Sequence, residues 1–171
     1  MQLDEAKRKF TEGWGTLGSA WGVSRTMAQV HALLLVTPGA LSTEDIMEQL
    51  QISRGNANMN VRALIDWGLV RKELRPGERR EFFSAEKDIH RVATLILKER
   101  RKRELEPIMR VLEDVSHVDM AGAPAADAQS FVSMVNSIRS FADLADRTAG
   151  TIIRADENWF LSTFMKLMRP G

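Results

Sequence analysis

The chain has 171 residues, of which 44% are hydrophobic and 27% charged, and it contains no cysteine. This length and composition are typical of a globular protein with a sizeable core, and they exclude a disulfide framework and a cysteine-based zinc site. The apolar run near Leu33 is too short to span a bilayer, and the charged start MQLDEAKRKF has no apolar signal-peptide core, so we expect a cytoplasmic protein.

Charge is unevenly distributed along the chain, although the net charge is only +1. Residues 1–41 carry 4 basic and 3 acidic side chains, residues 42–103 carry 14 and 10, and residues 104–171 carry 6 and 10. The basic middle indicates local contact with a polyanion. Many helical proteins separate charge without a nucleic-acid partner, so this observation needs support from a motif.

The first half of the chain predicts four helices in succession. Residues 3–20 carry apolar and aromatic side chains at helical spacing, and a helix over residues 25–36 follows the N-cap Ser24. Ser42 is expected to cap a short helix, with Asp45 at the capping-box position. After a tight turn, Ser53 caps a helix that runs to Trp67, and Gly68 supplies the left-handed residue that ends it.

Two strands, 69–75 and 79–85, are expected to flank the turn Pro76-Gly77-Glu78 and to form a hairpin with a basic rim. A long helix then begins after Asp88, and Pro107 either kinks it or starts a new one. Its basic run KERRKR is either a solvated face or a DNA contact. The linker lies near residues 121–127, and helices over 127–147 and 151–168 follow, separated at Gly150.

This order of elements predicts a mainly α fold with a small two-stranded β-wing. Residues 24–88 form a winged helix-turn-helix domain, and residues 1–23 and 89–171 form a helical dimerisation region. In this motif the second helix of the pair enters the major groove of DNA, and a two-fold dimer reads two half-sites. The terminal helices carry more apolar surface than a small winged domain can cover, although they could also fold back as a monomeric core.

The expected recognition helix, residues 53–67, is unusual because glycine and three asparagines occupy its first turns. Both residue types are poor helix formers. Small residues permit close approach to DNA, and asparagine offers a donor and an acceptor to adenine edges or phosphates. At 100° per residue, Ala57, Val61 and Leu64 face the core, and Gly55, Met59 and Arg62 lie opposite. The predicted DNA-binding residues are Ser53, Arg54, Gly55, Asn56, Asn58, Asn60, Arg62, Arg75, Arg79 and Arg80.

Three alternatives stay open within this set. Asn58 could turn toward the preceding helix instead of DNA. Met59 could contact a thymine methyl group or simply be exposed. Taken alone, Ser53-Arg54-Gly55-Asn56 could be an ordinary polar helix start. The preceding short helix and the basic wing (71–80) favour DNA binding.

Four short patterns, Leu41–Ile46 (LSTEDI), Ile52–Asn56 (ISRGN), Leu64–Val70 (LIDWGLV) and Pro76–Phe83 (PGERREFF), occur in this order. As a set they resemble the winged-helix segment of MarR-type regulators, and more closely the GbsR-like branch. The resemblance implies a cytoplasmic, homodimeric transcriptional regulator, often a repressor, that is dimerised through terminal helices. It also implies a recognition helix that starts at Ser53 and a wing at 76–80. A winged-helix module that binds protein instead of DNA is the alternative function.

A small-molecule effector is a further hypothesis, because some GbsR-like proteins respond to choline and aromatic faces bind quaternary ammonium groups. Trp14, Trp21, Trp159 and Phe160 could line such a site between the winged domain and the dimer helices. Aromatics at helical spacing are usually core, and the chain has no tyrosine.

Enzyme and cofactor functions are not supported by the sequence. Residues 13–18 spell GxGxxG, but no strand precedes them. We expect Gly15, Gly18 and Gly22 to permit close helix approach or a bend. The three histidines show no zinc spacing, and we expect His31 to be a core residue. We therefore predict no catalytic residues, metal or cofactor.

Overall fold

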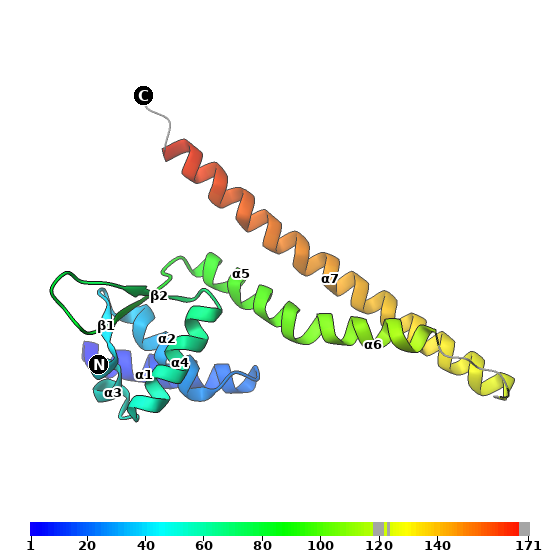
Figure 1. Ribbon diagram of the computed structural model, residues 1–171, viewed down its shortest axis with the longest axis horizontal. Coiled ribbons are helices and arrows are strands. Elements are labelled where there is room, and N and C mark those ends of the chain that lie inside the picture. The colour runs from blue at the N-terminus through cyan, green and yellow to red at the C-terminus, as the bar shows by residue number, and fades with distance from the viewer. Residues whose placement is uncertain (118–121, 123, 168–171) are drawn as a thin grey trace. The chain divides into compact units, whose positions relative to one another are not determined.

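The computed structural model describes residues 1–117, 122 and 124–167, with the side chains of this part as far as residue 155. The chain divides into two compact units, residues 1–92 and 93–171 (Figure 1). The first unit contains helices α1 (Leu3–Ala20), α2 (Arg25–Val36), α3 (Thr43–Leu50) and α4 (Arg54–Asp66) and strands β1 (Leu41–Ser42), β2 (Val70–Glu73) and β3 (Phe82–Ala85). Within the described residues, no helix is both long and apolar enough to cross a bilayer.

Serine side chains start three of these helices, as the sequence predicts. Ser24 Oγ accepts the Met27 N–H at 3.4 Å, and Ser53 Oγ accepts the Asn56 N–H at 3.2 Å. At α3 the capping box is complete, because Asp45 N–H donates to Ser42 Oγ at 3.2 Å and Asp45 Oδ2 accepts the Ser42 N–H at 2.8 Å. These bonds satisfy backbone donors that a helix start leaves without a partner.

Left-handed residues set the turns on either side of α4. Gln51, between α3 and α4, has φ 52°, and Gly68, after α4, has φ 75°. The Leu69 N–H then bonds the Leu64 carbonyl at 2.9 Å, which is the hydrogen bond of a Schellman motif. The helix pair and the start of the hairpin therefore follow the predicted turns.

The sheet has three antiparallel strands in the order β1-β3-β2. The expected hairpin of β2 and β3 is present, and β1 adds a third strand that was not predicted. Leu41 of β1 and Lys72 of β2 both pair with Phe83 of β3. A two-residue strand such as β1 is too short to show an alternating pattern. The hairpin strands are also shorter than expected, because residues 74–81 form the wing loop.

The α1–α2 pair shows why α1 is rich in glycine. A Cβ on Gly18 would lie 2.5 Å from the Ala28 Cβ, and a Cβ on Gly15 would lie 2.7 Å from the Gln29 Cγ. Both glycines therefore permit close packing of α1 on α2, as predicted for the GxGxxG sequence. This packing places α1 in the first unit. That residues 1–23 take part in dimerisation stays a prediction.

Lys87, which follows β3, forms hydrogen bonds with the C-terminal end of α2. Its Nζ donates to the carbonyls of Leu34 (2.6 Å), Leu35 (2.8 Å) and Thr37 (2.7 Å). A cation at the C-terminus of a helix satisfies free carbonyls and opposes the negative end of the helix dipole. Partial burial of this ammonium lowers its pKa.

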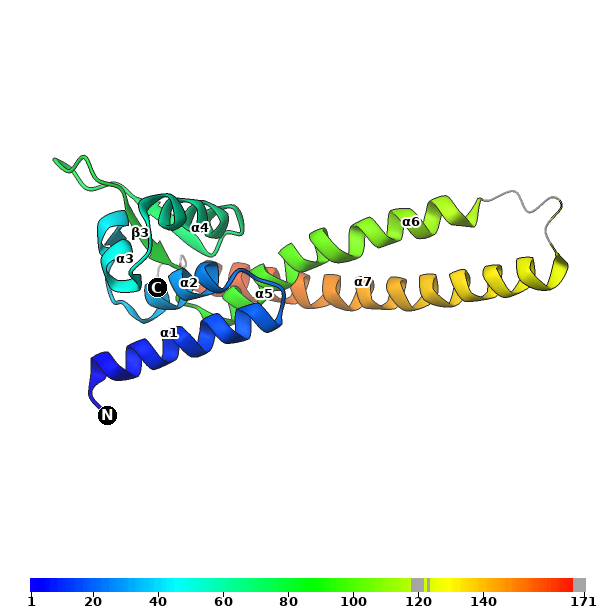
Figure 2. The same ribbon diagram turned by 90° about the horizontal axis from the view of Figure 1, so that it is seen from below.

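The second unit is a helical hairpin (Figure 2). The helix α5 (Ile89–Arg100) begins in the first unit, and its N-cap Asp88 accepts the His90 N–H at 2.9 Å. A π-helical turn η1 (Arg101–Leu105) then leads into α6 (Glu106–Ser116) and α7 (Ala125–Leu167). The π turn lies just before Pro107, whose ring would clash with the carbonyl four residues earlier in a regular α-helix.

Two expectations about this half need correction or completion. Helix α7 is continuous over 43 residues, so the predicted break at Gly150 is wrong. An isolated helical glycine costs about 1 kcal/mol and does not end a helix without a left-handed cap or a proline. The described parts of the expected linker are Gly122 and the segment from Pro124, and α7 already starts at Ala125. Residues 121 and 123 lie outside the described residues.

The basic run KERRKR, residues 98–103 at the end of α5 and the start of η1, is largely ion-paired. Arg101 Nε and Asp146 Oδ1 of α7 are 2.7 Å apart, and the second pair of atoms is 3.0 Å apart. Arg100 pairs with Glu104 at 3.0 Å, and Arg103 pairs with Glu99 at 2.6 Å. This arrangement favours the structural interpretation of KERRKR.

His31 is a buried core residue, as expected, with 3% of its surface exposed. Its ring lies 6.3 Å from that of Trp14, and no described residue offers its Nε2 a hydrogen bond. Desolvation, reinforced by the charge of Lys87, lowers the pKa of His31 from 6.5 to about 4. The folded protein therefore keeps this imidazole neutral.

This burial predicts a stability that depends on pH. Between pH 6.5 and 4, His31 is protonated in the unfolded chain and neutral in the folded protein. The free energy of unfolding therefore falls as the pH falls, by up to roughly 1.4 kcal/mol per pH unit. Urea unfolding of His31→Leu between pH 7.5 and 5 should show a shallower pH dependence than the wild type. His90→Gln, at an exposed histidine of α5, is the control and should retain the wild-type dependence. An unchanged dependence in His31→Leu would contradict the assignment.

Candidate nucleic-acid interface

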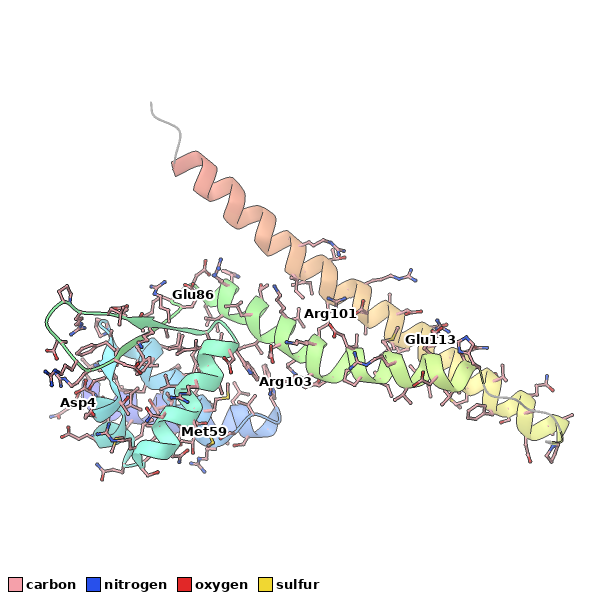
Figure 3. All side chains as sticks on the ribbon, in the orientation of Figure 1. Asp4, Met59, Glu86, Arg101, Arg103 and Glu113 are labelled. Atoms are coloured by element: carbon pink, nitrogen blue, oxygen red, sulfur yellow. The ribbon has the colours of Figure 1, made fainter. Side chains whose placement is uncertain are left out.

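Packing fixes which side of α4 is presented to solvent. Ala57, Val61 and Leu64 are at most 1% exposed, because this side packs on α2, α3 and β2. Gly55 and Arg62, on the opposite side, are exposed, and Met59 between them is 64% exposed (Figure 3). The predicted division of the helix into a core side and an outer side is confirmed for these residues.

Asn60 is not on the outer side, and its expected role in the groove is wrong. It is only 3% exposed, and its Nδ2 donates to the Asn56 carbonyl at 2.8 Å and to Asn56 Oδ1 at 2.6 Å. A buried amide needs partners, and this pair of bonds supplies them within the helix. Asn60 is therefore a structural residue that positions Asn56.

The bonds of Asn60 also define what Asn56 can offer to a ligand. Because a backbone carbonyl only accepts, the group of Asn60 that faces it must be the NH₂ group, and the oxygen of Asn56 must face that same group. The Asn56 NH₂ group is left as a donor. Asn58 is half-buried and accepts the Thr43 hydroxyl of α3 at 3.3 Å, which supports the alternative that it turns toward the preceding helix.

Arg54 begins α4 and is held across the helix pair. Its guanidinium lies 2.8 Å from the carboxylate of Glu44 on α3. A backbone hydrogen bond and then the bond from Arg54 lower the pKa of Glu44. The pair is solvent-exposed, so Arg54 can exchange this carboxylate for another anion at small cost.

The wing turns at Pro76 and Gly77. Gly77 has φ 82°, and the Glu78 N–H bonds the Arg75 carbonyl at 3.1 Å, an arrangement typical of a type II turn. Phe82, at the base of this loop, supports two of its arginines. The guanidinium of Arg75 lies 3.9 Å from the centre of the Phe82 ring, and that of Arg80 lies 5.4 Å from it.

This support of Arg75 and Arg80 by Phe82 was not predicted from the sequence. Two cations of the wing are paired with acidic side chains. Arg80 pairs with Glu78 at 3.2 Å, and Lys72 pairs with Glu81. Arg62 of α4 and Arg79 of the wing make no ion pair or hydrogen bond with any described residue, and both are exposed.

The aromatic residues expected at an effector site are not brought together by the described side chains. Trp14 is half-buried, stacks on Phe10 at 5.5 Å and lies against His31. Trp21 is 54% exposed at the end of α1. The side chains of Trp159 and Phe160 lie outside the described residues. Within the part of the chain that the structure describes, no three acidic or histidine side chains form a metal site.

Comparisons with known proteins agree with this geometry. Residues 21–81, which span α2 to the wing, match the sequence model of the MarR family. A crystal structure described as that of a transcriptional regulator has the same fold at a TM-score of 0.66 and 18% identity, over 90% of this chain and 99% of that chain. No curated protein matches the chain. Together these findings support a winged-helix fold, with residues 21–81 similar to the MarR family.

Proposed function

We propose, from the MarR-family match of residues 21–81, that this chain is a homodimeric transcriptional regulator that reads DNA with α4 and the wing. The observation that carries the proposal is the outer side of α4. It presents Gly55, Met59 and Arg62 along one exposed line. Arg62 makes no ion pair or hydrogen bond with a described residue, and the major groove offers acceptors and methyl groups to such a surface.

The wing supports the same proposal. Arg79 is exposed and unpaired beside the turn, and Phe82 holds Arg75 and Arg80 next to it. Arginines at a tight turn suit phosphates or a narrow minor groove. We assign base contacts to Arg62 and Asn56 and backbone contacts to Ser53, Arg54, Arg75, Arg79 and Arg80. Repression is the sign we propose, as in the GbsR-like proteins that the sequence resembles, because a bound dimer would block access to the operator.

Binding to duplex DNA tests this function. A duplex is first selected by the protein from a random pool, and its affinity is compared with that of a scrambled duplex across a salt series. Arg62→Ala should lose about five- to a hundredfold on the selected duplex and much less on the scrambled one. The double variant Arg79→Ala/Arg80→Ala should weaken both duplexes and reduce the salt slope by about one for each phosphate that is no longer neutralised.

Glu48→Gln is a suitable control, because Glu48 is exposed on α3 and its carboxylate makes no hydrogen bond or ion pair with a described residue. Weak binding that is equal for both duplexes and indifferent to Arg62 would contradict the proposal. The alternative, a winged-helix domain that binds another protein, would then account better for the exposed face of α4.

The proposed dimer rests on a second surface, the α7 stripe, which consists of Phe131, Met134, Ile138, Phe141 and Ile152. The first four follow the three- and four-residue spacing of a coiled-coil seam, and Ile152 lies at the position that this spacing reaches after three more steps. Each of the five is at least 43% exposed. Another side of α7 packs on α6 through Val135 and Ala142. Because α6 has 11 residues and α7 has 43, α6 cannot cover this surface, and a second copy is the occupant we propose.

Mass measurement in solution tests the α7 stripe. The wild-type chain of 19.3 kDa should run at twice this mass by light scattering, and Phe141→Glu should shift it toward the monomer. Ser140→Glu is the matched control, because Ser140 is exposed about 100° around the helix from Phe141 and points away from both α6 and the stripe. A dimer that survives Phe141→Glu unchanged would place the interface elsewhere.

We do not extend the proposal to a small-molecule effector. Trp14 is already packed on Phe10 and His31, and Trp21 is exposed. These contacts favour the core interpretation of Trp14.

A further inference from the structure

Within the part of the chain that the structure describes, neither backbone conformation nor close packing requires a glycine at position 55. Its φ is not in the left-handed region, and a Cβ built on it would meet nothing within 4 Å. By contrast, Gly18 is required by the closeness of Ala28, and Gly68 and Gly77 are required by their positive φ. A helical glycine without such a role lowers stability relative to alanine. A close approach by something outside the chain would explain the absence of a side chain.

Gly13 of α1 is also a helical glycine with open space around it. What distinguishes Gly55 is its surroundings. Met59 lies one turn further along the same side of α4, and the unpaired Arg62 follows three residues later. Gly55 therefore lies within the surface proposed to bind DNA, and Gly13 does not.

Met59 is the apolar member of this surface. It is 64% exposed, although it lies on the short helix whose other side forms the domain core. Methionine is unbranched and polarisable, so it adapts well to an apolar contact. Within the major groove the apolar group available to a side chain is the C5 methyl of thymine. Arg62, on the same side, suits the two acceptors of guanine.

We propose that Met59 reads the methyl group of a thymine, and that Gly55 is glycine so that α4 can come close enough for this contact. The inference rests on the proposed function, because it assumes that the outer side of α4 enters the major groove. It adds a specificity determinant that acts by packing and not by hydrogen bonding. It also explains why α4 has a destabilising glycine at position 55: the missing side chain leaves room for DNA.

The methyl contact is tested by removing the methyl group from the DNA. Duplexes are selected separately with the wild type and with Met59→Ala, and a thymine enriched by the wild type alone is replaced by deoxyuridine. The wild type should lose about three- to fivefold in affinity, which is the effect expected for one buried methyl group. Met59→Ala should bind the thymine and deoxyuridine duplexes equally.

The close approach is tested by adding a methyl group to the protein. Gly55→Ala should raise the melting temperature and should weaken binding to the selected duplex at least tenfold. Gly13→Ala is the matched control, because it also adds a methyl group to a helical glycine with open space, and it should stabilise the protein without affecting DNA binding.

The outcomes separate this inference from the function on which it rests. If the wild type prefers the selected duplex and Arg62→Ala reduces that preference, the function stands. The inference is then overturned if no thymine position depends on Met59, if deoxyuridine affects both proteins equally, or if Gly55→Ala binds as tightly as the wild type. If the wild type shows no preference for any duplex, both the function and the inference are contradicted.

Discussion

The proposed interface depends on the burial of one side of α4. Ala57, Val61 and Leu64 are nearly inaccessible, and only one rotation of the helix places all three in the core. Because side chains recur every 3.6 residues, this rotation also determines that Gly55, Met59 and Arg62 face outward. The hydrophobic effect therefore sets the geometry of a surface whose own residues contribute little to stability.

The start of α4 adds backbone donors that can bind an anion to this outward-facing surface. The Ser53 cap fixes the start of α4, where the first N–H groups have no partner within the helix. Around this point, several cations are already paired with carboxylates, including Arg54 with Glu44 and Arg80 with Glu78. Such pairing lowers the general electrostatic attraction to DNA, so a larger share of the proposed binding falls to the base contacts of Arg62 and Asn56.

Most of the winged unit could be predicted from the sequence, because its signals are local. Each serine cap, the left-handed Gly68 and the Pro76-Gly77 turn act over a few residues. The two-residue strand β1 was missed because it has no pattern of its own. The sequence predicts a break in α7 because Gly150 looks like a helix end, but a glycine in helical conformation does not end a helix.

The candidate site was predictable to a smaller extent. Helical phase identified the outer side of α4, but it could not distinguish Asn56 from Asn60, which lie on the same flank. Their difference arises from depth: Asn60 is buried and bonds back to Asn56. The support of Arg75 and Arg80 by Phe82 depends on a side-chain arrangement in three dimensions, which spacing along the chain does not reveal.

Hydrogen exchange of the 171-residue chain, with and without its selected duplex, is the most direct test of the central claim. The claim is that the start of α4 and the tip of the wing contact DNA. Local exchange rates report the protection of individual segments. We predict that the duplex slows exchange of the amides of residues 53–57 and 77–80, whereas those of α7 change little. Protection confined to α7, or none at residues 53–57, would contradict the account.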